Sequence, residues 1–161
     1  MPNHTSNRLT VNGPTKERDK FIEENRGAEE QLSLEQALPT PPEALGSNKI
    51  VNSNMPAWYN WRVNNWGTKW DVYDTTTWQD STIRFYSAWS PPMEWLREVA
   101  KKYPKLSFQL DYADEGGGFV GTMEAQGDYG EGISEYEWGS KKGIALRDDL
   151  GYYHPEDEGD D

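Results

Sequence analysis

The alternation of hydrophobic and polar positions is clearest in the second half of the chain. Residues 106–113, LSFQLDYA, alternate along their length, as a strand with one buried face does. The positions expected to face inward are Leu106, Phe108, Leu110 and Tyr112. A glycine-rich turn at 114–118 leads into a second apolar segment at 119–126. The pattern therefore predicts a β-hairpin.

Two further strands and two helices follow from the same kind of pattern. Residues 82–89, TIRFYSAW, alternate and predict a strand. In the next segment, 90–104, apolar residues recur at the spacing of one helix face. These residues are Leu96, Val99, Ala100 and Tyr103. Near the beginning of the chain, residues 7–12 predict a short strand and residues 15–26 a helix that Gly27 ends.

The middle of the chain is less regular. Residues 27–57 include PTPP, which fits neither a regular helix nor a central strand, so we interpret them as an irregular insertion across the surface. Residues 57–66 predict a short helix closed by Gly67, and residues 69–74 alternate like a strand.

The order of these elements predicts an α+β fold: a ferredoxin-like antiparallel sheet with helices on one face. At 161 residues the chain is long enough for one domain. We expect residues 1–126 to form this domain, with the insertion at about 27–57. Residues 127–161 are expected to form an acidic extension that contains aromatic residues and ends in a disordered tail.

The segment 58–70, WYNWRVNNWGTKW, holds four tryptophans and allows two interpretations. Only 34% of the chain is hydrophobic, so its aromatic side chains are needed in the core. Alternatively, the segment binds a small planar ligand such as a nucleotide, with rings that stack on it and polar groups that contact it. The candidate ligand-binding residues are Trp61, Arg62, Asn65, Trp66, Lys69 and Trp70.

Negative charge is concentrated in the last third of the chain. Residues 1–105 hold 13 Lys/Arg and 13 Asp/Glu, whereas residues 106–161 hold 3 and 15, so they account for the whole net charge of −12. A surface of one sign repels nucleic acid and anionic membranes and attracts basic surfaces. We expect Asp111 and Glu124 to project from the outward face of neighbouring strands. The candidate partner-binding residues are Asp111, Asp114, Glu115, Glu124, Asp128, Glu131, Glu135, Glu137, Asp148 and Asp149.

Catalytic chemistry has little support in the sequence. His4 and His154 lie near the two ends, where we expect both to be solvated rather than placed as a general base. The glycines at 116–118 lack the Lys-Ser/Thr of a phosphate loop, and the acids lack the spacing of a calcium loop. The chain has no cysteine, hence no disulfide and no thiolate metal site. We expect no catalytic residue, no metal and no cofactor.

The same sequence gives expectations about location. The first residues, MPNHTSNRLTVNG, contain no apolar core of a signal peptide, and no apolar run approaches the ~20 residues of a membrane span. We expect a protein of the bacterial cytoplasm with no membrane association.

Several motifs in a fixed order resemble a known family. They are the opening MPNHTSNRLTVNG, NNWGTKWD at 64–71, SAWSPP at 87–92 and FQLDYADEGGGFVG at 108–121. Together they resemble the YubB/Api92-like ferredoxin-like family of small bacteriophage and conjugative-plasmid proteins. The resemblance covers roughly residues 1–126. It implies the fold and an origin in a mobile element, but no reaction.

Two functional hypotheses follow. In the first, the chain is a non-enzymatic interaction or inhibitor protein whose acidic surface occupies the basic, nucleic-acid-binding site of a host defence or DNA-processing protein, without binding nucleic acid itself. In the second, it binds or sequesters a small ligand through the segment 58–70. The identity of the partner, the oligomeric state and the host do not follow from the sequence.

Overall fold

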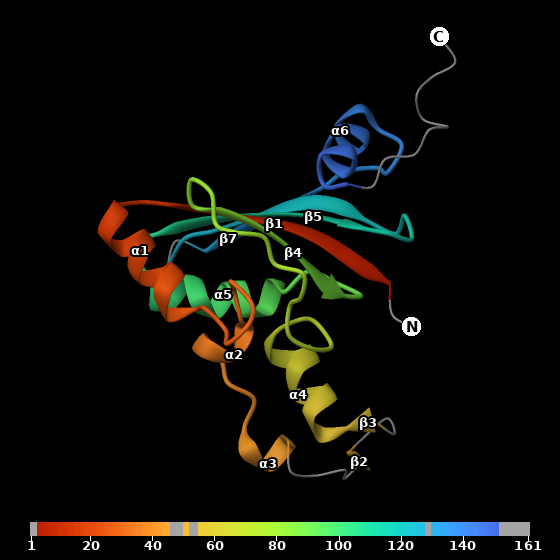
Figure 1. The fold of residues 1–161 in the computed structure, drawn as a ribbon. Coiled ribbons are helices and arrows are strands. Elements are labelled where there is room, and N and C mark those ends of the chain that lie inside the picture. Colours follow the sequence, from red (N-terminus) through yellow and green to blue (C-terminus); the bar gives the residue numbers. More distant parts are fainter. Residues whose placement is uncertain (1–2, 46–49, 52–54, 128–129, 152–161) are drawn as a thin grey trace.

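The fold is built on one five-stranded antiparallel sheet, seen in a computed structural model that describes residues 3–45, 50–51, 55–127 and 130–151 (Figure 1). The strands lie in the order β4-β1-β5-β6-β7. Their bounds are β1 (His4–Asn12), β4 (Thr82–Ala88), β5 (Ser107–Asp114), β6 (Val120–Ala125) and β7 (Glu131–Glu135). A separate two-stranded sheet pairs β2 (Ile50–Val51) with β3 (Met55–Pro56).

Helices lie on both faces of the large sheet. Figure 1 shows α1, α2 and α5 below the sheet and α6 above it. The bounds are α1 (Thr15–Glu24), α2 (Leu34–Ala37), α3 (Pro42–Leu45), α4 (Ala57–Asn65), α5 (Met93–Lys102) and α6 (Lys141–Asp149). The expectation that the helices would share one face is therefore wrong for α6, which the sequence pattern had not predicted. None of the described helices is long and apolar enough to cross a membrane.

A split β-α-β unit confirms the ferredoxin-like α+β fold. Both β4 and β5 run antiparallel to β1, so they are parallel to each other with β1 between them. Helix α5 makes the connection from β4 to β5 across one face of the sheet. The hairpin of β5 and β6 then extends the sheet, and β7 adds its last strand.

The main core lies between the sheet and the helices α1 and α5. Every second residue of β5 points into it, and the four predicted positions from Leu106 to Tyr112 are all buried. Phe21 of α1 packs edge-on against Phe108, with 5.2 Å between the ring centres, and also contacts Trp95 of α5. The aliphatic-poor sequence thus fills its core with rings, each of which buries a large apolar area.

A second, smaller core lies on the opposite face, beneath α6. Ala113 of β5 and Val120 of β6 are buried there with Leu150, and Tyr136, Trp138 and Leu146 pack against them. The predicted division at residue 126 falls between β6 and β7, two strands that pair along their length. The described part of the expected extension, 130–151, therefore belongs to the sheet and its covering layer.

Two predictions about the middle of the chain need revision. Residues 69–74 form no strand, and only an isolated bridge between Tyr73 and Tyr86 joins them to β4. The insertion at 27–57 contains regular elements: the short helices α2 and α3 and the hairpin of β2 and β3. The helices predicted at 15–26, 57–66 and 90–104 are present as α1, α4 and α5.

Candidate functional site

Asp111 does not belong to the surface on which the sequence placed it. Only 2% of the residue is exposed, because α6 covers this part of β5. Its Oδ2 pairs with Arg8 Nη2 of β1 at 3.0 Å, and its Oδ1 accepts a hydrogen bond from Thr122 Oγ1 at 2.6 Å. Gln109 donates a third, longer hydrogen bond at 3.2 Å. This charge is satisfied inside the protein and is not available to a partner.

Asp114 is likewise a structural acid rather than a binding residue. It is buried at the end of β5, where its Oδ2 accepts a hydrogen bond from the backbone N–H of Gly118 at 2.9 Å. This bond closes the glycine-rich turn between β5 and β6. Glu115, the next residue, is exposed, and its Oε1 accepts from the backbone N–H of His4 at 2.8 Å.

His4 is not solvated, contrary to expectation. It lies half-buried at the beginning of β1 between the rings of Tyr73 and Tyr86, at 5.5 and 5.7 Å between ring centres. Its Nδ1 is hydrogen-bonded to the hydroxyl of Tyr73. Burial raises the pKa of Tyr73 to about 12, and the nearby Glu115 carboxylate adds to this effect. His154 lies outside the described residues.

Asp149, at the end of α6, fastens the helix to the sheet. Asp149 forms an ion pair with Arg8 and a longer one, at 3.9 Å, with Arg84 of β4. The hydrogen bond from Arg8 is the main reason why the pKa of Asp149 is lowered from its ordinary value. Arg84 Nη1 also donates to the backbone carbonyl of Asp149 at 2.6 Å. Asp148, beside it, is half-buried. The negative charge of Asp149 is therefore offset by the two arginines.

The remaining predicted acids gather at the β7 edge of the sheet. Glu124 of β6, Glu131 and Glu135 of β7, and Glu137 just after it are exposed. We call these four residues the acidic edge. Glu131 pairs with Arg97 of α5 at 2.5 Å, and Glu135 accepts a hydrogen bond from the hydroxyl of Tyr112 at 3.1 Å. Asp128 lies outside the described residues.

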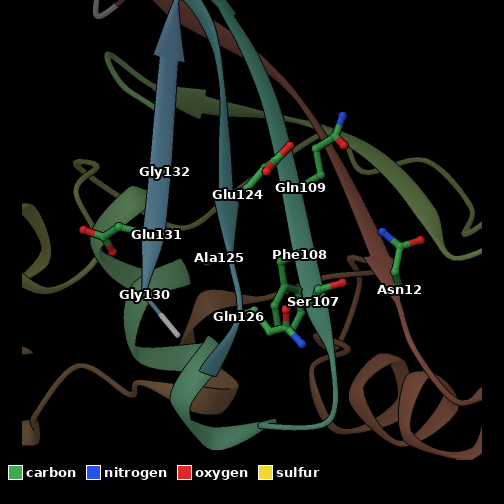
Figure 2. A pocket seen from close by; sticks show the side chains of 10 residues that line it. All are labelled: Asn12, Ser107, Phe108, Gln109, Glu124, Ala125, Gln126, Gly130, Glu131 and Gly132. Atoms are coloured by element: carbon green, nitrogen blue, oxygen red, sulfur yellow. The ribbon is translucent and has the colours of Figure 1, made fainter. Parts of the chain in front are cut away.

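A hollow of about 450 Å³ lies beside the acidic edge (Figure 2). Its lining comes from β1, β5, β6 and β7 and is mostly polar. The lining residues are Asn12, Ser107, Phe108, Gln109, Glu124, Ala125, Gln126, Gly130, Glu131 and Gly132. Figure 2 shows Gln109 and Glu124 next to each other on paired positions of β5 and β6, whereas Glu131 points away from them. The sequence reasoning missed this hollow because only the strand register brings its residues together.

Trp66 of the predicted ligand set is a core residue. It is completely buried, and its indole N–H donates to the carbonyl of Leu38 at 2.9 Å. Trp61 packs edge-on against it with 5.7 Å between ring centres. A ring without exposed surface cannot stack on a ligand, so the assignment of Trp66 as a ligand-binding residue is wrong.

The polar members of that set are also occupied by neighbours. The Arg62 guanidinium lies over the rings of Trp58 and Trp66, at 5.2 and 5.0 Å, and pairs with Glu35 at 3.3 Å. Asn65 donates to the carbonyl of Trp61 at 2.8 Å.

Lys69 lies next to two tryptophan rings. Its ammonium contacts the rings of Trp70 and Trp89, at 4.7 and 4.8 Å. Trp89 was not among the predicted residues, although it is 38% exposed and adopts a φ of 71° that is rare for a bulky side chain. Because Trp66 is buried and Arg62 and Asn65 are engaged by neighbours, the six predicted residues do not all face one ligand site.

Metal coordination finds no support within the described ranges. No group of three or more His, Asp or Glu side chains there is arranged to hold a metal ion.

Comparison with known protein families shows to which family the chain is related. Residues 65–156, more than half of the chain, match the ferredoxin-like domain in Api92-like protein. The chain belongs to this family. No curated protein and no solved structure gave a significant match. The Api92-like match confirms the resemblance, but it begins at residue 65 and continues beyond residue 126.

The acidic edge lies inside the Api92-like domain. The match includes β4, α5, β5, β6, β7 and α6, hence the split β-α-β unit and all four acids of the edge. β1 lies before the matched range, although it is the strand between β4 and β5.

Proposed function

We propose that the chain is a non-enzymatic interaction protein whose acidic edge binds a basic surface of another protein. The partner class is a host defence or DNA-processing protein, and the surface that is occupied is its nucleic-acid-binding site. The observation that carries the proposal is the exposure of four carboxylates at the last two strands of the sheet and just after them: Glu131 and Glu135 on one face, Glu124 on the other, and Glu137 next to the end of β7. The origin in a phage or plasmid, implied by the sequence resemblance, supports an inhibitory role.

Charge density limits how far this surface imitates DNA. Glu131 and Glu135 are four residues apart on one strand, which corresponds to ~13 Å at ~3.3 Å per residue. Duplex DNA carries about eight charges over that length, at one per ~1.7 Å. Over that length the edge supplies three carboxylates, those of Glu124, Glu131 and Glu135, which is less than half of that number. We therefore propose that the edge engages part of a basic site and does not replace a long stretch of duplex.

Electrostatics explains how such a surface selects its partners. A field of one sign accelerates the association of an oppositely charged protein and discourages like-charged ones. The net charge of −12 also opposes binding to nucleic acid. Binding through the edge should therefore weaken as salt screens the charges, over a Debye length of ~10 Å at 0.1 M.

A capture experiment with two variants of equal net charge tests the proposal. The edge variant carries Glu→Gln at Glu124, Glu131, Glu135 and Glu137. The matched control neutralises four exposed acids far from the edge in sequence: Asp19, Glu23, Glu29 and Glu43. Each tagged protein is incubated with bacterial lysate that has been treated with nuclease, and the bound proteins are eluted with increasing salt.

The proposal predicts a nucleic-acid-binding protein that the wild type and the control capture and the edge variant does not. Purified duplex DNA should compete with the wild type for that protein. Equal capture by all three proteins, or capture that salt does not weaken, would contradict the proposal.

A further inference from the structure

The outer edge of β7 ends the sheet among the described strands. Two backbone hydrogen bonds show which residue pairs of the β6–β7 ladder are hydrogen-bonded. The Gln126 N–H donates to the Gly130 carbonyl, and the Tyr136 N–H donates to the Val120 carbonyl. In an antiparallel ladder, hydrogen-bonded pairs alternate with non-hydrogen-bonded pairs. The residues of β7 that bond to β6 are thus the even-numbered ones.

The odd-numbered residues of β7 consequently point their backbone groups outward. They are Glu131, Ile133 and Glu135, and their N–H and C=O groups have no strand beside them in the part of the chain that the structure describes. An exposed edge of this kind is a template for a strand from another chain. All five side-chain positions of β7 are exposed, and 44% of Ile133 is accessible to solvent.

The side of β7 that faces the hollow carries almost no side chains. Gly132 pairs with Glu124 of β6, and Gly130 and Gly132 both line the hollow. A Cβ added to either glycine would meet nothing within 4 Å. Because β7 leaves this space open, a neighbouring strand has a clear path across it to the carboxylate of Glu124 and the amides of Gln109 and Gln126.

We propose that β7 accepts an extended basic segment of the partner as a sixth strand, with a lysine or arginine side chain lying over Gly132 in the hollow. The inference rests on the proposed function and specifies how the acidic edge binds. Adjacent strands lie ~4.8 Å apart, so the added strand would lie ~9.6 Å from β6. A long basic side chain over Gly132 covers most of that separation and meets Glu124 in the hollow.

Charge identifies the occupant as a basic strand rather than a second copy of this chain. On the face opposite the hollow, an added strand would lie next to Glu131 and Glu135, with Ile133 between them. A second copy paired edge to edge would bring these acids of both copies together, and like charges on adjacent strands are unfavourable. A lysine or arginine opposite Gly132 meets Glu124 on one face, and basic residues opposite Glu131 and Glu135 meet these acids on the other face.

Two substitutions block the added strand through different physical effects. Gly132→Val fills the space over β7 with a residue that strands favour, and the absence of neighbours within 4 Å leaves room for it. Ile133→Pro removes an outward N–H without removing a hydrogen bond to β6. Ile133→Thr is the matched control, because it changes the same side chain and keeps the N–H.

The test begins with a displayed library of short random peptides, from which those that bind the wild-type protein are selected. The inference predicts enrichment of lysine and arginine at two positions four residues apart, opposite Glu131 and Glu135, and at one position between them on the other face, opposite Gly132. The selected peptide, once synthesised, should bind Gly132→Val and Ile133→Pro about tenfold or more weakly than the wild type and Ile133→Thr. Its binding should also slow amide hydrogen exchange at Glu131, Ile133 and Glu135 by at least about tenfold.

The outcomes separate this inference from the function on which it rests. If Glu124→Gln weakens the peptide while Gly132→Val and Ile133→Pro bind it normally, the acidic edge binds its partner without strand addition, and the inference is wrong. Basic residues enriched without this spacing would also overturn it. If Ile133→Pro fails to fold, Gly132→Val and the exchange at the three outward amides decide the question. The proposed function itself stands or fails with the capture experiment.

Discussion

Arg8 of β1 and Asp111 of β5 face each other across paired strands and form an ion pair at 3.0 Å beneath α6. Arg8 also pairs with Asp149 at the end of α6. One arginine thus joins the middle of the sheet to the helix that covers it. The relationship explains why two acids from the most acidic part of the sequence contribute to the fold and add little to the surface charge.

Removal of Asp111 should destabilise the protein. Asp111→Ala leaves Arg8 and the Thr122 hydroxyl without their buried acceptor, at a cost of about 2–3 kcal/mol in the free energy of unfolding. Denaturant unfolding measures this change. Glu124→Gln, an exposed position on the next strand, is the control and should change stability by less than ~0.5 kcal/mol. Equal effects of the two substitutions would mean that Asp111 is not buried as described.

The attachment of α6 should weaken in acid. The Arg8 hydrogen bond lowers the pKa of Asp149 in the folded protein below its unfolded value, so this group stabilises the fold above its ordinary pKa of 3.8. The contribution is lost as the pH falls through the lowered folded value. Asp149→Asn should therefore be less stable than the wild type at neutral pH and should converge with it in strong acid. A difference that stays constant with pH would argue against this ion pair.

Alkaline pH should destabilise the protein through two partly buried tyrosines, Tyr73 and Tyr103. Burial raises the pKa of Tyr73 and of Tyr103 from 10.0 to about 12 in each case. A folded pKa above the unfolded one gives stability that is present below pH 10 and lost as the pH rises towards 12. Tyr103→Phe should reduce the slope of stability against pH in that range, as measured by unfolding at a series of pH values. An unchanged slope would show that Tyr103 ionises normally.

The tryptophans should divide into core and surface groups. Trp66→Ala should cost about 3–5 kcal/mol in the free energy of unfolding, because it empties a fully buried site. Trp89→Ala should cost about 1 kcal/mol or less, since the partly exposed ring loses only its contacts with Lys69 and with the edge-on ring of Tyr59. Comparable losses at the two positions would contradict the placement of Trp66 in the core.

Strict periodicity made much of the fold predictable from the sequence. The sequence of β5 alternates without interruption, and that of α5 repeats its apolar residues at the spacing of one helix face. Both elements are present in the structure. The segment 69–74 alternates in sequence but forms only a single bridge to β4, and Asp74, with a φ of 51°, takes the chain out of the extended conformation. α6 was missed because its apolar face is narrow and its anchors, Tyr136 and Trp138, precede it in the chain.

The binding surface was less predictable, because acids that are near one another in the sequence differ in whether the fold buries or exposes them. Asp111 and Glu124 both carry the alternation of an outward strand face, yet α6 covers Asp111 and leaves Glu124 exposed. No local pattern distinguishes them. The hollow beside the acidic edge likewise depends on the pairing of Gln109, Glu124 and Gly132 across three strands.

The most direct test of the acidic edge is the affinity of the captured partner for three proteins over a range of salt concentrations. These are the wild type, the edge variant with its four glutamates replaced by glutamine, and the control with four acids replaced elsewhere. The proposed function predicts tight, salt-sensitive binding by the wild type and the control, and weak binding that depends less on salt for the edge variant. If the control loses as much affinity as the edge variant, overall charge governs binding, and the acidic edge is not the site.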